Sequence, residues 1–464
     1  MLYLKKIFFG RVVEKKEIRV RKIVSILVMI TTCVVYVPAV YTVTATFIAP
    51  TQITAGAFTI SAPGFYVLTD DLTFSPGASS TAITISSNNV TLDMNGKYLI
   101  GGNSNANIGI EIPASQNDII IRNGYITDFA GYGVRVDEGT TYTAITLENL
   151  TIKDRQAGLC MSFSEATDCF VRNCQCSGGS QAGVFATCAR FQLTDSTFSN
   201  NSSTGLSLTT CQDFKITNCQ ANDTVANGGI GALISSCDNI VFQNCFFNDN
   251  VSTGNTIALG AQALSSNYIS FFNCEFCKNR NVITNATNDA AGLDINGSIG
   301  VIVRNSLFNN NNTTSGTASG VRLSGASHGN YLESCIASDN FTTGTGAVNG
   351  FDLRSTSSNS YFNSCIALRN RSNTGASTGF SAGTSQINVF KNCQAYSNTG
   401  GGANQGFLDT NGTAQNWYAG NLAFGHGSDA GNYSSIIGYV HLGVNAIPPA
   451  GSYDERGIDN ISIS

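Results

Sequence analysis

One short pattern that recurs eleven times between Asn123 and Cys393 constrains the fold of this 464-residue chain more than any other feature. Each copy has an apolar residue, a spacer, Asn or a similar polar residue, a small residue that is often Cys, a second spacer and another apolar residue. Successive copies lie 22 to 32 residues apart, which is too long for a coiled-coil heptad and is typical of a solenoid with one repeat per turn. The polar column reads Asn123, Asn149, Asn173, Asp195, Asn218, Asn244, Asn273, Asn305, Ser334, Ser364 and Asn392.

Apolar residues alternate with spacers on both sides of this polar column, which is the two-residue period of β-strands. The position two places before the column is apolar in every copy, and the position directly after it is Cys in seven of the eleven. Asn adopts a left-handed backbone more readily than other non-glycine residues. The column therefore predicts a tight corner between two short strands.

A third strand is expected earlier in each repeat, where an alternating run follows a glycine, as in Gly-Val-Arg-Val at 133–136 and Gly-Phe-Asp-Leu at 350–353. Three short strands per repeat can bury their apolar positions only if the chain winds into a cylinder in which like residues stack. The predicted fold class is therefore all-β, a single-stranded parallel β-helix of about twelve coils with three short strands per coil. Because neighbouring strands lie ~4.8 Å apart, such a rod is ~60 Å long.

Two early segments are similar to the opening coils of right-handed β-helix proteins of the pectin-lyase-like superfamily. They are Asn-Asn-Val-Thr-Leu-Asp-Met-Asn-Gly at 88–96 and Asp-Ile-Ile-Ile-Arg-Asn-Gly at 118–124. The resemblance extends over residues 50–425 and implies that the solenoid is right-handed. That superfamily includes polysaccharide lyases, hydrolases, epimerases, tail-spike proteins and non-catalytic surface proteins, so the resemblance indicates a fold and leaves the activity open.

The first 45 residues differ from the rest, because eight Lys and Arg residues precede an apolar run at 23–43 and small residues at 43–45. This arrangement predicts a secretory signal and hence a secreted or cell-envelope protein. The alternative is an uncleaved anchor, since an apolar run of this length can span a bilayer, and membrane contact would then be through this segment alone. The expected divisions are 1–45 signal or anchor, 46–98 N-terminal cap and first coil, 99–425 parallel β-helix, and 426–464 C-terminal cap and tail.

Charged residues make up 12% of the chain and the net charge is -5, so solubility depends on uncharged polar groups. Since no basic stripe with interleaved aromatics is present, a nucleic-acid partner is not expected. Fifteen cysteines in an exported chain normally indicate disulfides, but here most occupy columns in which Cys interchanges with Ser and Ala. We expect stacked free thiols, and neither a metal site nor a cofactor, because no His accompanies them with metal-ligand spacing.

The candidate site lies on the first strand of each coil, where long connections at 248–259, 279–291, 309–319, 340–349 and 370–378 are expected to wall a groove. Outward positions are expected two places after each glycine, at Glu111, Arg135, Cys160, Phe185, Ser207, Leu233, Gln262, Asp294, Arg322, Asp352, Ser381 and Leu408. Three consecutive coils in this line carry the charged residues Asp294, Arg322 and Asp352. Beside them are the candidate ligand contacts Asn296, Ser324 and Arg354.

Two interpretations of this charged line remain open. In the first, Asp294, Arg322 and Asp352 are catalytic residues of a saccharide site, where an arginine could also neutralise a uronate or abstract a proton for β-elimination. The carboxylates of Asp294 and Asp352 would lie about 9.5 Å apart, near the upper end of the separations that inverting glycosidases use. Alternatively, the line is a ladder of opposite charges that keeps the sheet paired and soluble. The segment Gly-His-Gly at 425–427 resembles a motif of polygalacturonases, but the paired aspartates that accompany the motif in that family are absent.

Two classes of function follow from these observations. The first is an exported, non-catalytic solenoid that presents the groove over the first strand of each coil to a polysaccharide, a surface glycan or a partner. The second is a polysaccharide lyase, hydrolase or epimerase of the pectin-lyase-like type. The scarcity of His, Lys and clustered acids on the expected groove face favours the first class. The sequence does not indicate an oligomeric state.

Overall fold

The computed structural model describes residues 44–426, apart from 54–56, 114, 138–141, 154–157, 285–287, 355 and 411–415, together with the backbone of 433–434. The chain divides into two units, Met1–Thr44 and Ala45–Ser464. The predicted signal or anchor and most of the predicted C-terminal cap and tail lie outside the described residues. Within the described part, no helix has the length and apolar character needed to cross a bilayer.

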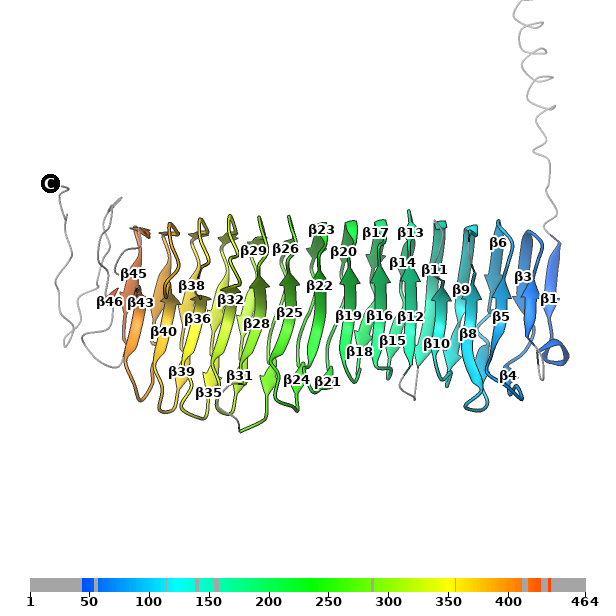
Figure 1. The fold of residues 1–464 in the computed structure, drawn as a ribbon, viewed down its shortest axis with the longest axis horizontal. Coiled ribbons are helices and arrows are strands. Elements are labelled where there is room, and N and C mark those ends of the chain that lie inside the picture. Colours follow the sequence, from blue (N-terminus) through cyan, green and yellow to red (C-terminus); the bar gives the residue numbers. More distant parts are fainter. Residues whose placement is uncertain are drawn as a thin grey trace, which may run out of the picture. The chain divides into compact units, whose positions relative to one another are not determined.

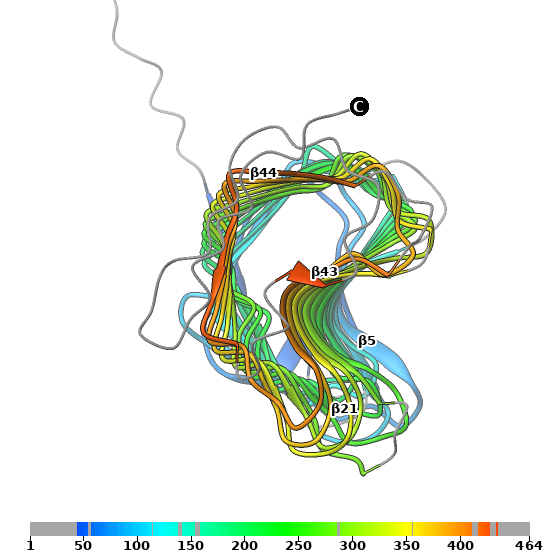
Figure 2. The same ribbon diagram turned by 90° about the vertical axis from the view of Figure 1, so that its left-hand side faces the viewer.

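The second unit is an all-β solenoid, as predicted, in which each coil pairs with the next through parallel strands. It has about 13 turns, close to the twelve expected. Among the described residues the only helical element is the short 3-10 turn η1 (Pro50–Gln52). Figure 1 shows the coils stacked side by side in chain order, and Figure 2 shows along the stack how their strands superimpose.

The first sheet extends along the whole solenoid and contains the predicted groove strands. Its 15 strands are β2 (Phe58–Ile60), β5 (Ser80–Ile85), β8 (Ala106–Ile112), β10 (Tyr132–Val136), β12 (Leu159–Ser164), β16 (Gln181–Ala186), β19 (Thr204–Thr209), β22 (Ile230–Ser235), β25 (Ala258–Leu264), β28 (Ala290–Asn296), β32 (Ala318–Ser324), β36 (Val348–Leu353), β40 (Ser377–Ser381), β43 (Asn404–Leu408) and β46 (Tyr433–Ser434).

The second sheet contains the strands that lead into the polar corner and, in the earlier coils, the strands that leave it. Its 20 strands are β1 (Ala45–Ile48), β3 (Gly64–Leu68), β4 (Leu72–Phe74), β6 (Val90–Asp93), β7 (Tyr98–Gly101), β9 (Asn117–Thr127), β11 (Tyr142–Lys153), β13 (Ala166–Thr167), β14 (Phe170–Arg172), β15 (Gln175–Ser177), β17 (Ala189–Thr194), β18 (Thr197–Ser199), β20 (Gln212–Thr217), β23 (Asp238–Gln243), β26 (Ser270–Phe272), β29 (Ile302–Arg304), β33 (Tyr331–Glu333), β37 (Tyr361–Asn363), β41 (Val389–Lys391) and β44 (Trp417–Ala419).

Two smaller sheets complete the later coils. The third sheet continues beyond the corner as β30 (Leu307–Asn309), β34 (Ile336–Ser338), β38 (Ile366–Leu368), β42 (Gln394–Tyr396) and β45 (Leu422–Phe424). The fourth sheet lies within the long connections and consists of two-residue strands, β21 (Val225–Ala226), β24 (Val251–Ser252), β27 (Arg280–Asn281), β31 (Asn312–Thr313), β35 (Phe341–Thr342) and β39 (Arg371–Ser372).

The polar corner forms as the sequence predicts. All eleven residues of the column have a left-handed backbone, with φ between 50° and 58°. Many of their side chains also form a ladder along the surface, in which Asn149 Nδ2 donates to Asn123 Oδ1 at 2.9 Å and Asn173 Nδ2 donates to Asn149 Oδ1 at 2.8 Å. The column therefore turns the backbone and ties neighbouring coils together.

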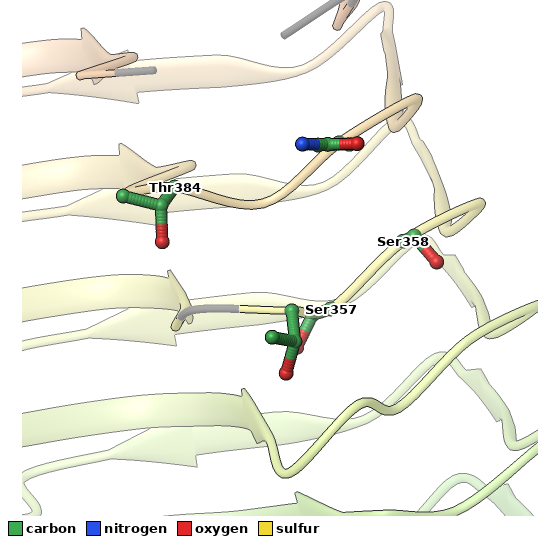
Figure 3. A pocket seen from close by; sticks show the side chains of 5 residues that line it. Ser357, Ser358 and Thr384 are labelled. Atoms are coloured by element: carbon green, nitrogen blue, oxygen red, sulfur yellow. The ribbon is translucent and has the colours of Figure 1, made fainter.

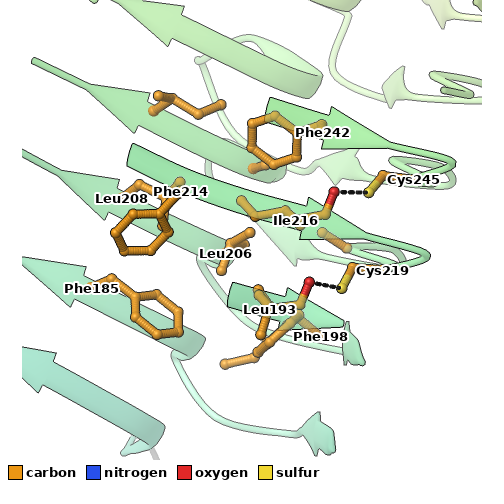
Figure 4. Packing of buried hydrophobic residues seen from close by; sticks show 14 of the residues in the cluster. Phe185, Leu193, Phe198, Leu206, Leu208, Phe214, Ile216, Cys219, Phe242 and Cys245 are labelled. Atoms are coloured by element: carbon orange, nitrogen blue, oxygen red, sulfur yellow. Dashed lines mark hydrogen bonds between the residues drawn. The ribbon is translucent and has the colours of Figure 1, made fainter. Parts of the chain in front are cut away.

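The interior is filled by columns of like side chains. Phe242 stacks on Phe271 with ring centroids 4.9 Å apart. Figure 4 shows other buried side chains of the core, among them Phe185, Phe214 and Phe242, on successive coils. The thiols of Cys219 and Cys245 donate to the carbonyl oxygens of Leu193 and Ile216 on the coil before. All 14 cysteines in the described residues are free, and all except the half-buried Cys277 are buried. The prediction of stacked free thiols is thus confirmed there.

The predicted register of the first sheet is wrong in two coils. Strand β12 pairs Met161 with Val134, so Cys160 occupies the glycine position and its side chain is buried in the core. One coil later, Gly183 pairs with Leu206, and Phe185 also points inward. Phe185 is one residue from the outward position, and a shift of one residue moves a side chain to the other face of a strand. Cys160 is two residues from the outward position and lies in the buried glycine column at the start of the strand. The outward positions there belong to Ser162 and Val184, which pair with each other across β12 and β16.

Candidate functional site

Three consecutive strands bring the predicted charged residues together. β28 pairs Asp294 with Arg322 of β32, and β32 pairs Arg322 with Asp352 of β36. Each lies between residues whose side chains fill the core, such as Leu293 and Ile295. The alternation of the strand therefore turns the three charged side chains to the outer face of the first sheet, as predicted.

Five charged side chains, which we call the charged cluster, alternate in sign across the outer face. Arg322 Nε donates to Asp294 Oδ1 at 2.8 Å, and its Nη1 lies 3.2 Å from Asp289 Oδ2. Arg354 Nη1 lies 2.8 Å from that same Asp289 oxygen. Arg354 Nε lies 2.8 Å from Asp352 Oδ2. Asp289 therefore joins the two arginines into one continuous network.

Neutral donors add further hydrogen bonds to the two buried aspartates. Gln262 Nε2 donates to Asp294 Oδ2 at 2.9 Å, and Ser324 Oγ lies 3.3 Å from Asp294 Oδ1. Ser319 Oγ donates to Asp352 Oδ2 at 3.3 Å. Asp294 is 0% exposed and Asp352 is 5% exposed. Both carboxylates are thus held in fixed positions and shielded from solvent.

The two arginines are held in their charged form. Burial opposes the charge on Arg322, but attraction to Asp294 and a hydrogen bond with it raise the pKa of this guanidinium above its usual value. Burial acts on Arg354 in the same way, and the charges of Asp352 and Asp289 again raise its pKa. A guanidinium that does not lose its proton cannot abstract one, so neither arginine suits the role of a base.

The predicted ligand contacts lie at the rim of the charged cluster. Asn296 pairs with Ser324 at the ends of β28 and β32, and both side chains are half-buried. Arg354 follows the end of β36, and 34% of its side chain is exposed, more than for any other member of the cluster. A molecule that approaches this part of the first sheet would therefore meet Arg354, Asn296 and Ser324 before the aspartates.

Sequence reasoning missed Asp289, which lies in the connection before β28. Its Oδ1 accepts a hydrogen bond from the backbone nitrogen of Thr317 at 2.9 Å, and its Oδ2 accepts from Arg322 and Arg354. Connections have no two-residue period, so their residues cannot be assigned to a face from spacing. The sequence offered only a weaker indication than strand spacing: Asp289 directly precedes the first strand of the coil that carries Asp294.

The long connections form an ordered wall. Their two-residue strands pair in the fourth sheet, and a column of buried asparagines supports them from within. In this asparagine ladder, the side-chain amide of one asparagine donates to the side-chain oxygen of the next. Asn279 Nδ2 donates to Asn311 Oδ1 at 3.0 Å, and Asn311 Nδ2 donates to Asn340 Oδ1 at 3.0 Å. Its members are Asn250, Asn279, Asn311, Asn340, Asn370 and Asn398.

His426 ends this ladder and has a structural environment. Its Nδ1 accepts a hydrogen bond from the backbone nitrogen of Asn398 at 3.2 Å, and its Nε2 lies 3.1 Å from the carbonyl oxygen of Ala395. These contacts assign the proton to Nε2. The side chain is 5% exposed, and burial lowers its pKa below the usual value. A neutral, buried imidazole in place of an asparagine gives no support to the polygalacturonase-like interpretation.

A polar hollow lies next to the charged cluster, where the chain leaves β36 and β40. It has a volume of about 340 Å³ and is lined by Thr356, Ser357, Ser358, Thr384 and Gln386. Figure 3 shows Thr384 on one coil and Ser357 with Ser358 on the neighbouring coil. In the described residues no three His, Cys, Asp or Glu side chains are placed to share a metal ion.

Comparison with known proteins agrees with the fold. Residues 108–276 match the family model described as a right-handed β-helix region. No curated relative matches the sequence. Among solved structures, the A-module of a mannuronan C-5 epimerase from Azotobacter vinelandii is 13% identical, with 79% of this chain and 91% of that chain covered and a TM-score of 0.44.

Other solved structures are similarly distant. A pectate lyase is 15% identical, with 73% of this chain and 69% of that chain covered and a TM-score of 0.32. A surface adhesin of Streptococcus pneumoniae is 8% identical, with 86% of this chain and 94% of that chain covered and a TM-score of 0.37. All three TM-scores lie below 0.5, so these likenesses assign no activity to this chain.

Proposed function

We propose that this right-handed parallel β-helix is an exported solenoid that binds a glycan along its first sheet without cleaving or epimerising it. One observation carries the proposal: the carboxylates of Asp294 and Asp352 are buried, and each is bonded to an arginine and to neutral side chains of the protein. The charged cluster then acts as part of the scaffold. Arg354, Asn296 and Ser324 at its rim provide the ligand contacts.

The chemistry of polysaccharide cleavage requires groups that this cluster does not offer. An inverting hydrolase needs a carboxyl group that can reach the leaving oxygen, whereas both of these buried carboxylates are already bonded to side chains of the protein. A lyase or an epimerase needs a base that reaches a proton on the sugar ring. The arginines have raised pKa values, and the aspartates are covered by their partners.

The rim of the cluster is suited to binding. The part of the Arg354 guanidinium that remains exposed can donate to a sugar hydroxyl or carboxylate, and its ion pairs hold it in position. Asn296 and Ser324 add amide and hydroxyl groups on the adjacent coils. The wall formed by the fourth sheet fixes the edge of this surface, so a ligand would bind with little reorganisation of the protein.

The test is a screen of the full chain against acidic and neutral polysaccharides, in which unsaturated product, reducing ends and bound glycan are all measured. We expect binding without product. Arg354→Ala should weaken binding about tenfold, the effect of losing one charge-assisted hydrogen bond worth about 1.5 kcal/mol. Arg135→Ala is the matched control, since Arg135 lies in the same outward column on β10, several coils away.

Product that appears with the wild-type chain and disappears in the double variant Asp294→Asn with Asp352→Asn would establish an enzyme and overturn the proposal. Binding that Arg135→Ala weakens as much as Arg354→Ala would move the ligand away from the charged cluster. Binding to a protein surface, with no affinity for any glycan, would replace the glycan with a protein partner.

A further inference from the structure

A second surface with binding chemistry lies on the second sheet, in the early coils and apart from the charged cluster. The rings of Tyr98 on β7 and Tyr125 on β9 stack face to face, with centroids 4.4 Å apart and planes 13° from parallel. Tyr98 is 41% exposed and Tyr125 is 38% exposed. Two large aromatic rings thus stand on the outside of the solenoid with their edges in solvent.

The stack stops after two rings although the strands continue. On the next coil the residue paired with Tyr125 is Thr151 of β11, whose side chain is much shorter than a tyrosine ring. The face of Tyr125 that points away from Tyr98 is therefore left without a third ring. A hollow of about 370 Å³ lies here, and Tyr125, Thr151, Thr127, Asp128 and Lys153 are among its lining residues.

The second wall of the hollow is the adjacent outward column. It consists of Ile100, Thr127 and Lys153, which pair with one another across β7, β9 and β11. Ile100 and the threonines present apolar and hydroxyl groups, and Lys153 places an exposed ammonium at the end of the column. Lys153 forms no salt bridge with another described residue, although eleven other ion pairs are found in that part of the chain.

We propose that this hollow, which we call the tyrosine site, binds a pyranose ring that carries an anionic substituent. The sugar ring takes the place of the missing third ring, with its apolar C–H face on Tyr125 and its edge over Thr151. The anionic group, a carboxylate or a sulfate, lies against the Lys153 ammonium. The proposal does not depend on the function proposed for the first sheet, because the two surfaces share no residue.

The physical basis is a combination of three contacts. Stacking removes apolar surface of both the sugar and Tyr125 from water, which stabilises the complex without requiring a particular hydroxyl pattern. The ammonium selects for negative charge, and its contribution weakens with salt because it is exposed. The size of the hollow falls within the range of about 300–1,000 Å³ that is usual for small-ligand sites.

A second tyrosine pair provides a matched control. Tyr331 and Tyr361 also stack on consecutive coils of the second sheet, with centroids 5.4 Å apart. There the guanidinium of Arg304 lies over the Tyr331 ring at 5.3 Å, and Val389 follows Tyr361 on the next coil. Removing Tyr361 deletes a comparable aromatic ring from the same sheet without altering the tyrosine site.

The experiment is titration calorimetry of the full chain with three probes: an oligogalacturonate, a chondroitin sulfate oligosaccharide and a neutral dextran oligosaccharide. We expect binding of at least one anionic probe and none of the neutral one. Tyr125→Ala and Lys153→Ala should each reduce affinity at least tenfold, whereas Tyr125→Phe and Tyr361→Ala should leave it unchanged. The affinity of the wild-type chain should fall as salt is raised, and that of Lys153→Ala should not.

Thr151→Tyr decides the outcome if Tyr125→Ala affects folding. This variant fills the third position with a protein ring, so in an Arg354→Ala background it should abolish the remaining binding while the chain stays folded by circular dichroism. Affinity that the folded double variant Thr151→Tyr with Arg354→Ala keeps at the level of Arg354→Ala alone, or equal losses in Tyr125→Ala and Tyr361→Ala, would overturn the tyrosine site. Binding that Arg354→Ala weakens but Thr151→Tyr does not would assign the glycan to the first sheet and also refute this site.

Discussion

The earlier and later coils support their long connections in different ways. From Asn250 onward, each coil supplies one buried asparagine whose amide bonds to the coils on both sides. The equivalent positions one and two coils earlier are Thr224 and Asn201, which are also buried. There the Thr224 hydroxyl and both amide atoms of Asn201 have no hydrogen-bond partner in the described residues.

This difference shows what the later connections require. A connection that runs over a coil buries backbone groups that must be bonded, and a side-chain amide can satisfy one donor and one acceptor at each coil. The charged cluster lies on the same later coils, where β28, β32 and β36 carry its members. The later half of the solenoid therefore depends on buried polar networks, whereas the interior of the earlier half depends mainly on apolar and thiol columns.

The largest effect is expected from breaking the charged cluster. Asp294→Ala leaves Arg322 buried without its closest partner and should lower the free energy of unfolding by about 3–5 kcal/mol. The control is Asp339→Ala, which breaks a half-exposed pair with Arg369 and should cost about 1 kcal/mol or less. Urea unfolding followed by circular dichroism measures both, and similar losses would show that the charged cluster does not contribute to stability.

The next largest effect concerns the asparagine ladder. Asn311→Ala removes the oxygen that accepts from the backbone and side chain of Asn279, and the amide that donates to the carbonyl oxygen of Phe276. It should lower the free energy of unfolding by about 2–4 kcal/mol. Asn201→Ala removes a side-chain amide that makes no such hydrogen bonds, so it should lower the free energy of unfolding by clearly less. Equal destabilisation by the two substitutions in the same urea experiment would contradict the contrast between the two halves.

A smaller, pH-dependent effect is expected where the ladder ends. Because burial lowers the pKa of His426 in the folded chain, the unfolded chain binds more protons near pH 6. Stability should therefore be complete above the unfolded pKa of about 6.5 and decline as the pH falls toward 5, by at most ~1.4 kcal/mol per pH unit. His426→Asn restores the usual ladder residue and should abolish this slope in melting curves recorded from pH 7 to 5. An unchanged slope in His426→Asn would show that the pH dependence arises from another group.

The smallest effect is expected at a surface pair. Hydrogen bonds from Arg369 lower the pKa of Asp339 in the folded chain. Its contribution to stability is thus present above the unfolded pKa of about 3.9 and is lost as the pH falls through the folded pKa. The wild-type chain and Asp339→Asn should differ slightly in melting temperature at pH 7 and converge near pH 2. A difference that persists at low pH would show that the pair acts through packing.

The sequence predicted the repeating parts of this molecule because they obey a period. Stacked columns and left-handed corners follow from spacing alone, and so does the alignment of Asp294, Arg322 and Asp352. Prediction failed where the glycine lies out of register with the other coils. A shift of one place turned Phe185 to the other face, and a shift of two places put Cys160 in the buried glycine column.

Other features depend on structure that has no period. Asp289 belongs to a connection, and its contact with two arginines depends on the path of that connection. The tyrosine site was also missed, because it arises where an outward column of the second sheet ends at Thr151, and the sequence analysis followed outward positions only on the first strand of each coil. The burial of Asp294 could not be read from alternation, which placed it correctly on the outer face.

The solenoid requires that like side chains be enclosed in its interior, one above another on successive coils. The direct test is alkylation of the native full chain with iodoacetamide, followed by peptide mass mapping, because the thiols in the described coils lie at known depths. Burial also raises the pKa of the Cys174 thiol to about 11, which slows its reaction further. We predict that Cys277 reacts first and that the column cysteines react only after unfolding. Rapid labelling of Cys219, Cys245 and Cys365 in the native chain, or their recovery as disulfides, would contradict the account.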